Sequence, residues 1–550
     1  MFTSAAILAT LLAVGSTAAA IPKSFASPKN AAAAGRPGHT NRLPEGDPPY
    51  GRGVHRRRSF PWRHRVMVFA VVASGAALVI PSSSAVSADT GEGVAKRANC
   101  GPGSLPETGV QGQVPLKDRE SGRSKQGYRC NLERLGGYQG EGATYVNPSY
   151  KNCAYMGTSL GGVLGKKSQG TQVVDVSDPA NPKLTANLTS PAMLTGTWET
   201  LKVNEKRGLL AAVSAGAGVG GLFFDVYDIS QDCAHPRLLN SFANSSFTLP
   251  TNVLGHEGGW APDGRTYYAS GLVAGSLTAI DVTDPTRPRI VFTGAAGIPA
   301  NHGFSLSTDG NRMYIARVAP AGVDVIDTSQ IQSRRLLPMI RQLGHVSWSD
   351  GLITQHTISI THQGKPYLVA VDEFGAGGVK FIDLSDERQP KVTDRLRLEI
   401  QTPQHVDERR ADTTGNGLFG YEAHYCSVNR PDEPTMMACS EFQSGVRVFD
   451  IRDFSTPQEV AYYNPPAQPD KRDELKGSEH ASGLFTGALS GLVLSDITNY
   501  DIGYASLEPA NLSTDWCTSP PRFVGEDQLW VTCQDTGFNV LRFTNGVHND

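Results

Sequence analysis

The chain repeats a short apolar segment that ends in an acidic turn. One copy reads Val173-Val174-Asp175-Val176-Ser177-Asp178-Pro179, in which branched apolar residues precede the turn. Branched apolar residues favour strands, whereas Asp, Ser and Pro favour turns. The first aspartate of the unit recurs as Asp175, Asp228, Asp281, Asp327, Asp383 and Asp450. We expect each of these side chains to cap its turn by accepting hydrogen bonds from backbone N–H groups.

Each repeat also contains an earlier apolar strand, ahead of the acidic one. These strands are expected at 153–156, 209–212, 266–269, 312–315, 367–370 and 436–439. Periods of roughly 40–50 residues with several strands per unit are typical of β-propeller blades. A seventh copy has strands at 529–532 and 538–543, and Arg542 replaces its aspartate. The pattern therefore predicts an all-β fold, a seven-bladed β-propeller with four-stranded blades.

The chain ends before the seventh copy can supply a fourth strand. Residues 131–136, ahead of the first copy, resemble the strand that follows each acidic turn. We expect this segment to complete the last blade and close the ring, which removes the exposed edge of a linear array. The predicted propeller spans 130–545. The interval from Asp450 to Arg542 leaves room for an eighth blade, but residues 464–515 are rich in Pro, Asp and Gly and are better explained as an insertion.

The copies resemble the LVIVD repeat, most clearly in Gln172-Val173-Val174-Asp175-Val176 and Thr278-Ala279-Ile280-Asp281-Val282. The resemblance covers about residues 130–545. It implies a secreted or surface-attached bacterial β-propeller. The family carries no general enzymatic assignment, so the resemblance implies a fold more than a function.

Residues 1–88 are interpreted as an export region rather than a folded domain. Arg56-Arg57-Arg58 precedes the apolar stretch 66–80, and Val86-Ser87-Ala88 offers small residues for cleavage. A signal peptide is therefore expected at about 56–88, behind an upstream extension, and the arginines are compatible with either general or twin-arginine export. Residues 89–129 form an N-terminal extension of the propeller. The apolar stretch is shorter than the ~20 residues that a spanning helix needs, so no stable membrane span is expected.

The cysteine count agrees with export. None of the eight cysteines forms a close Cys-x-x-Cys pair, so zinc, the alternative interpretation, lacks its usual spacing. An even count in an exported chain indicates disulfides and a secreted or cell-surface protein. Cys426 with Cys439 and Cys517 with Cys533 are expected to link neighbouring strands, which leaves Cys100 with Cys130 and Cys153 with Cys233.

Four consecutive predicted blades begin their inner strand with a histidine, and these are His256, His302, His356 and His424. Inner strands line the central channel, so equivalent positions form a ring around it. Four imidazoles that converge there would suit a divalent transition metal such as Fe, Cu, Zn or Mn. The placement is similar to that in carotenoid oxygenases, where one histidine from each of four blades holds iron. Asp372 and Glu441, at the ends of second strands, are expected to support the histidines from the same channel mouth.

The histidines also have a structural interpretation, because repeats duplicate side chains that tie blades together through backbone carbonyls. His362 and His480 do not occupy the position at which the other four histidines recur, and they are expected at the surface or in loops. Glu257 is expected to be solvated. Motifs for a serine nucleophile, a phosphate-binding loop and a His-Glu-x-x-His zinc site are missing from the sequence. The net charge of -3 and the lack of a basic stripe argue against nucleic acid.

Three functions remain open on this evidence. The leading prediction is a secreted, monomeric binding or interaction scaffold, with a polar, histidine-lined channel mouth that takes an unknown protein or a small polar ligand. The alternative is a metal-dependent, oxidative enzyme that uses His256, His302, His356 and His424 as metal ligands. The third is cell-surface adhesion without a small-molecule site.

Overall fold

The computed structural model describes most of the chain from Gly93 onward, and the residue ranges are 93–159, 169–215, 220–221, 223–240, 255–375, 377–414, 416, 419–467, 475, 477–482 and 513–548. The predicted export region 1–88 and most of the predicted insertion 464–515 lie outside the described residues, and both stay predictions.

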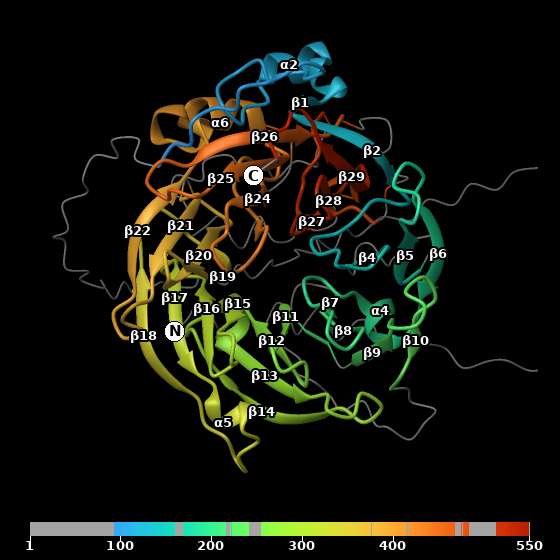
Figure 1. The fold of residues 1–550 in the computed structure, drawn as a ribbon, viewed down its shortest axis with the longest axis vertical. Helices are drawn as coiled ribbons and strands as arrows, with labels where there is room; N and C mark the ends of the chain where they lie inside the picture. Colours follow the sequence, from blue (N-terminus) through green and yellow to red (C-terminus); the bar gives the residue numbers. More distant parts are fainter. Residues whose placement is uncertain are drawn as a thin grey trace, which may run out of the picture. The chain divides into compact units, whose positions relative to one another are not determined.

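Seven antiparallel sheets surround a central axis within the described part of the chain (Figure 1), which confirms the predicted seven-bladed β-propeller. Blade 1 contains β3 (Ser149–Tyr150), β4 (Cys153–Met156), β5 (Thr171–Asp175) and β6 (Lys183–Leu188), and blade 2 contains β7 (Lys202–Asn204), β8 (Leu209–Val213), β9 (Phe224–Asp228) and β10 (Arg237–Leu238). Blade 3 contains β11 (Glu257–Trp260), β12 (Thr266–Gly271), β13 (Ser276–Asp281) and β14 (Arg289–Ala295), and blade 4 contains β15 (Asn301–Leu306), β16 (Arg312–Arg317), β17 (Gly322–Asp327) and β18 (Arg341–Ser347).

The remaining blades follow the same plan. Blade 5 contains β19 (Thr354–His362), β20 (Lys365–Asp372), β21 (Val379–Asp383) and β22 (Lys391–Leu396). Blade 6 contains β23 (Tyr425–Val428), β24 (Met436–Ser440), β25 (Val446–Asp450), β26 (Gln458–Asn464) and β1 (Tyr128–Cys130), and blade 7 contains β27 (Arg522–Val524), β28 (Gln528–Cys533), β29 (Gly537–Phe543) and β2 (Leu132–Tyr138). The described helices are α2 (Leu116–Ser121), η2 (Arg123–Gln126), α4 (Pro191–Thr195), η4 (Val273–Gly275), α5 (Ser329–Gln332), η5 (Glu399–Gln401), η6 (Pro403–His405), α6 (Val406–Thr413) and α7 (Glu479–Ser482).

The core lies between neighbouring blades. All five residues of β8 are buried, and side chains of β8 and β9 pack against Tyr267, Ala269 and Ile280 of blade 3. A blade is covered on both faces, so its middle strands are continuous apolar runs rather than alternating patterns. This burial explains why the sequence repeats were visible as runs of branched residues.

The ring closes as predicted, through β2. This strand pairs antiparallel with β29 and opposes Leu132 to Phe543, so the N-terminal part of the propeller completes the last blade. One detail of the prediction is wrong, because blade 6 has five strands. β1 pairs with β26 and opposes Tyr128 to Asn464. The N-terminal extension therefore contributes to the sheet, and it was missed because three residues carry no repeat pattern.

The acidic turns confirm the capping role predicted for the repeated aspartates. In each of the six copies, one carboxylate oxygen accepts the backbone N–H of the residue two positions later, at 2.7 to 3.0 Å. This bond satisfies a backbone donor at the end of the third strand. The aspartates of the repeat are thus structural, and the search for chemistry moves to the channel.

The eight cysteines form four disulfides, in the pairs expected from the sequence. They join Cys100 to Cys130, Cys153 to Cys233, Cys426 to Cys439 and Cys517 to Cys533. Such bridges persist in oxidising, extracytoplasmic compartments. Among the described residues, every helix is too short or too polar to cross a membrane.

Candidate metal centre

The four histidines predicted at equivalent blade positions lie at the starts of the innermost strands of four neighbouring blades. His302 and His356 belong to β15 and β19, whereas His256 and His424 immediately precede β11 and β23. All four side chains are buried, with residue exposures between 0% and 7%. The inner strands surround the axis (Figure 1), and the low exposures show that the four side chains are shielded from solvent.

A glutamate that the sequence analysis did not single out, Glu199 of blade 2, connects the histidines. Its Oε2 lies 3.4 Å from Nε2 of His256 and 3.8 Å from Nδ1 of His302. Its Oε1 lies 3.1 Å from Nε2 of His424 and accepts a hydrogen bond of 3.0 Å from Gln355. Glu199 follows Trp198, whose φ of 45° turns the chain at the register position of blade 2.

Two further carboxylates border the same group. Glu257 Oε2 lies 3.6 Å from Nδ1 of His302, and Glu257 Oε1 pairs with Nζ of Lys202 at 3.2 Å. Glu373 lies between two histidines, at 3.8 Å from Nε2 of His302 and 3.8 Å from Nε2 of His424. Glu257 is only 3% exposed, so the prediction of a solvated side chain was wrong.

Several buried polar atoms in this group have no hydrogen-bond partner in the described structure. They are Oε2 of Glu199, Oε2 of Glu257, Nδ1 of His302 and Nε2 of His356. A buried acceptor or donor without a partner costs roughly 1–3 kcal/mol, and native proteins seldom retain several in one place. Carboxylate oxygens and imidazole nitrogens are also the atoms that bind transition metals.

The surroundings shift the pKa values of the titratable groups at this site in different directions. Burial alone would raise the pKa of Glu199, but electrostatic interaction with His302 and the close contacts with His256 and His424 hold this pKa well below its usual value. Burial and the charges of neighbouring glutamates raise the pKa of Glu373 well above its usual value. Burial lowers the pKa of His356 to about 4. These shifts favour the anionic form of Glu199, the protonated form of Glu373 and the neutral form of His356.

Glu199, His256 and His302 form the group whose ligand atoms all lie within 4.8 Å of one another. His356 and His424 were expected as two further ligands, but the structure does not include them in this group. His424 instead donates from Nδ1 to the carbonyl of Thr518, at 2.7 Å, which ties blade 6 to the start of blade 7. The structure thus offers two histidines and one carboxylate where four histidines were expected.

The two carboxylates expected to support the histidines have other partners. Asp372 pairs with Nζ of Lys380 at 2.5 Å and accepts a hydrogen bond from Trp348. Glu441 accepts a 2.6 Å hydrogen bond from Gln401, and burial raises its pKa to about 7. The carboxylates that border the histidines are therefore Glu199, which precedes β7, Glu257, the first residue of β11, and Glu373, which directly follows Asp372 at the end of β20.

The two histidines outside the register are buried, contrary to expectation. His362 stacks on Phe454 with ring centroids 3.8 Å apart. His480 is fully buried and pairs through Nδ1 with Asp535 at 2.8 Å, next to Asp515. Asp515 already accepts four hydrogen bonds, from Trp516, Asp535 and Thr536. A carboxylate has about four lone-pair sites, so the carboxylate of Asp515 is saturated by its protein partners.

A cavity of about 450 Å³ lies where the inner strands of several blades end. Its lining includes Lys202, Trp260, Val428 and Arg522. Lys202 connects this cavity to the histidine group, because its Nζ contacts Glu257, which borders His302. The cavity is therefore separated from the candidate centre by two side chains.

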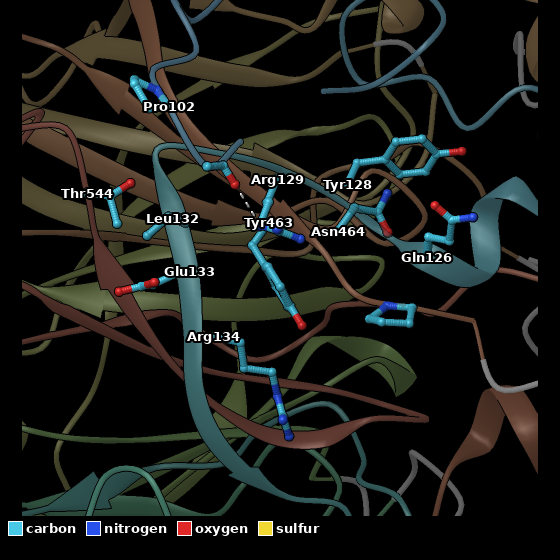
Figure 2. Close-up of a pocket in the computed structure, with 12 residues that line it drawn as sticks. Pro102, Gln126, Tyr128, Arg129, Leu132, Glu133, Arg134, Tyr463, Asn464 and Thr544 are labelled. Atoms are coloured by element: carbon cyan, nitrogen blue, oxygen red, sulfur yellow. Dashed lines mark hydrogen bonds between the residues drawn. The ribbon is translucent and has the colours of Figure 1, made fainter. Parts of the chain in front are cut away.

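A second cavity of about 450 Å³ lies at the junction of blades 6 and 7. Figure 2 shows its lining, with Tyr463 between Arg129 of β1 and Arg134 of β2. Arg129 donates a 3.2 Å hydrogen bond to the carbonyl of Gly103 there. The histidine group does not line this cavity.

Comparisons with known proteins add no function. No protein-family model and no curated protein matches the chain, so the resemblance to the LVIVD repeat stays a prediction. Among solved structures, a functionally unknown protein from Desulfotomaculum acetoxidans is 12% identical with a TM-score of 0.40, and the match covers 58% of this chain and 86% of that one. A protein from Lactobacillus plantarum is 14% identical with a TM-score of 0.41, covering 57% and 82%. A periplasmic gluconolactonase from Pseudomonas aeruginosa is 12% identical with a TM-score of 0.35, covering 46% and 70%.

Proposed function

We propose that the chain is an exported, metal-dependent enzyme whose propeller channel binds a divalent transition metal through Glu199, His256 and His302. Two observations carry the proposal: Glu199, His256 and His302 offer ligand atoms that all lie within 4.8 Å of one another, and Oε2 of Glu199 and Nδ1 of His302 are buried without hydrogen-bond partners in the described structure. Two histidines and one carboxylate with open positions are typical of catalytic zinc sites and of mononuclear iron sites. The metal would supply a Lewis acid and a position for water or another small ligand.

The neighbouring residues have roles in this proposal that follow from their charge. The raised pKa of Glu373 favours its protonated form, and the side chain lies 3.8 Å from His302, so it would act as a proton donor beside the centre. Glu257 is an anion held by Lys202 and would accept a proton on the opposite side of His302. The cavity lined by Lys202 would admit a small polar substrate, because the cavity is adjacent to the pair of Lys202 and Glu257.

Metal analysis of the purified protein tests the proposal. We expect about one equivalent of transition metal in the wild type, and loss of that metal in Glu199→Gln and His302→Ala. His345→Ala is the matched control, because this histidine is exposed on β18 and should not change the metal content. Failure of the wild type to bind Zn²⁺, Mn²⁺, Fe²⁺ or Cu²⁺, or retention of the metal by both site variants, would contradict the proposal.

A metal-free binding scaffold is the second candidate function. The cavity of about 450 Å³ favours it, because a volume of this size suits a small ligand, and Lys202 with Arg522 gives it a polar lining. A ligand that stabilises both the wild type and Glu199→Gln equally would favour the scaffold. A ligand that needs the metal would favour the enzyme.

A further inference from the structure

The segment between α5 and β18 carries three exposed apolar side chains, which we call the apolar tip. Leu336 is 88% exposed, Leu337 is 84% exposed and Met339 is 70% exposed. Among the described residues only Leu184 and Ile298 are further large apolar side chains of this kind, and each stands alone in sequence. Single exposed apolar residues are ordinary, whereas a contiguous group marks an interaction site.

The base of the tip is anchored to two blades. Arg334 pairs with Asp281 of blade 3 at 3.1 Å, and Gln332 donates a 2.8 Å hydrogen bond to the hydroxyl of Tyr268. The backbone N–H of Met339 donates to the side chain of Gln330 at 3.1 Å. These bonds hold the segment in a defined position, and Figure 1 shows it projecting from the outer rim beside α5.

The backbone holds the apolar side chains outward. Arg334 and Leu337 have φ values of 55° and 56°, a left-handed conformation that residues with a Cβ seldom adopt. Such strain persists where the surrounding structure imposes it, and it gathers at functional sites. Here the strained turn leaves Leu336 and Leu337 in solvent. Their exposure adds nothing to the folding stability of the isolated chain.

The tip lies in an arginine-rich segment, in which Arg334 pairs with Asp281 at 3.1 Å and Arg341 lies 3.8 Å from Asp327. Three arginines, Arg334, Arg335 and Arg341, flank it, and the sequence has no carboxylate between Asp327 and Asp350. Arg335 is exposed, and the side chain of Arg341 is 74% exposed. An apolar tip between arginines complements an anionic lipid surface, where apolar side chains enter the acyl boundary and guanidinium groups contact phosphates.

We propose that the apolar tip docks this protein on an anionic lipid surface, with Leu336, Leu337 and Met339 as the inserting side chains. The competing occupant is a second copy of the chain, with two tips packed against each other, but that arrangement would also bring the exposed Arg335 side chains of both copies together. The proposal is independent of the metal centre, since no residue of the tip touches it.

Flotation with lipid vesicles tests the docking. The wild type should float with vesicles that contain phosphatidylglycerol, bind much less to phosphatidylcholine alone, and dissociate as salt is raised. The double variant Leu336→Ser with Leu337→Ser should bind about tenfold more weakly or worse, because each leucine loses its burial in lipid. Arg335→Gln should weaken binding to the anionic vesicles alone. Leu184→Ser, on β6, is the control for an exposed leucine elsewhere and should bind as the wild type does.

The Leu337→Trp variant gives a second readout that does not depend on affinity. The emission that this variant adds to that of the six native tryptophans should shift to shorter wavelength on the vesicles and be quenched by brominated lipid. Equal binding of the wild type and the double variant, or an unshifted tryptophan, would overturn the proposal. A concentration-dependent dimer that the double variant loses would also overturn it, in favour of self-association.

Discussion

Glu199 at the start of blade 2 lies 3.1 Å from Nε2 of His424 at the start of blade 6, so one carboxylate contacts side chains on opposite sides of the channel. The same carboxylate lies 3.4 Å from His256 through its other oxygen. A buried anion between histidines is stable only if protons or a metal ion balance it. The charge of Glu199 is therefore the feature on which metal binding depends.

Metal affinity should fall as the pH is lowered. The imidazole nitrogens must be free of protons to bind a metal, and burial lowers the pKa of His302 so that it is neutral near pH 7. We expect the affinity to be constant above about pH 6.5 and, once the pH falls below the lowered imidazole pKa, to decrease about tenfold per pH unit for each proton that the metal displaces. Competition titrations with a chromophoric chelator measure this slope. An affinity that stays constant as the pH falls below this pKa would argue against imidazole ligands.

Glu441 should make the wild type less stable as the pH rises. Burial raises the pKa of Glu441 to about 7, from 4.5 in an unfolded chain, despite the hydrogen bond from Gln401. The folded protein therefore keeps the Glu441 proton over a pH range in which the unfolded chain has lost it. The stabilisation from this proton is fully present below the pKa of the unfolded state and is lost as the pH rises through the pKa of the folded state. Relative to Glu441→Gln, the free energy of unfolding should fall by about 3 kcal/mol from about pH 4 to about pH 8.

Urea unfolding of both proteins at several pH values measures this difference. Glu526→Gln, at an exposed position, is the control and should follow the wild type. If the curves for the wild type and Glu441→Gln stay parallel, the carboxyl group is not held protonated by its surroundings.

The four disulfides should differ in their contribution to stability according to the chain they enclose. Cys153 and Cys233 are 80 residues apart and join blades 1 and 2, whereas Cys426 and Cys439 are 13 residues apart within blade 6. In the chain-entropy model, removal costs about 4.5 kcal/mol for the first bridge and about 3 kcal/mol for the second. Double alanine variants, compared by urea unfolding, give the two values. A larger loss for the blade 6 variant would contradict the ranking.

The propeller could be predicted because its information is repeated. A strand and a capped turn occur six times with the same aspartate, and the burial of both sheet faces makes the apolar runs conspicuous. β1 occurs once, is three residues long and pairs only because the N-terminal extension lies against blade 6. A segment of that kind leaves no pattern in a single sequence.

The candidate centre was predicted only in part, and Glu199 shows why. The position in blade 2 that is equivalent to the four histidines holds Trp198, so the histidine pattern points to no ligand in this blade. The residue after that position is glutamate in both blade 2 and blade 3, as Glu199 and Glu257, and these two residues form a β-bridge with each other. That shared pair was the available signal. The burial of His480 had no comparable signal, because it lies outside every repeat.

Anomalous diffraction from crystals grown with the metal that the purified protein retains tests the central claim most directly. We predict one strong peak at the absorption edge of that metal, about 2.0–2.2 Å from a carboxylate oxygen of Glu199 and from one ring nitrogen each of His256 and His302. Crystals of Glu199→Gln should lack the peak while the propeller is unchanged. No peak in the channel of the wild type, or a peak bound by other side chains, would contradict the proposed centre.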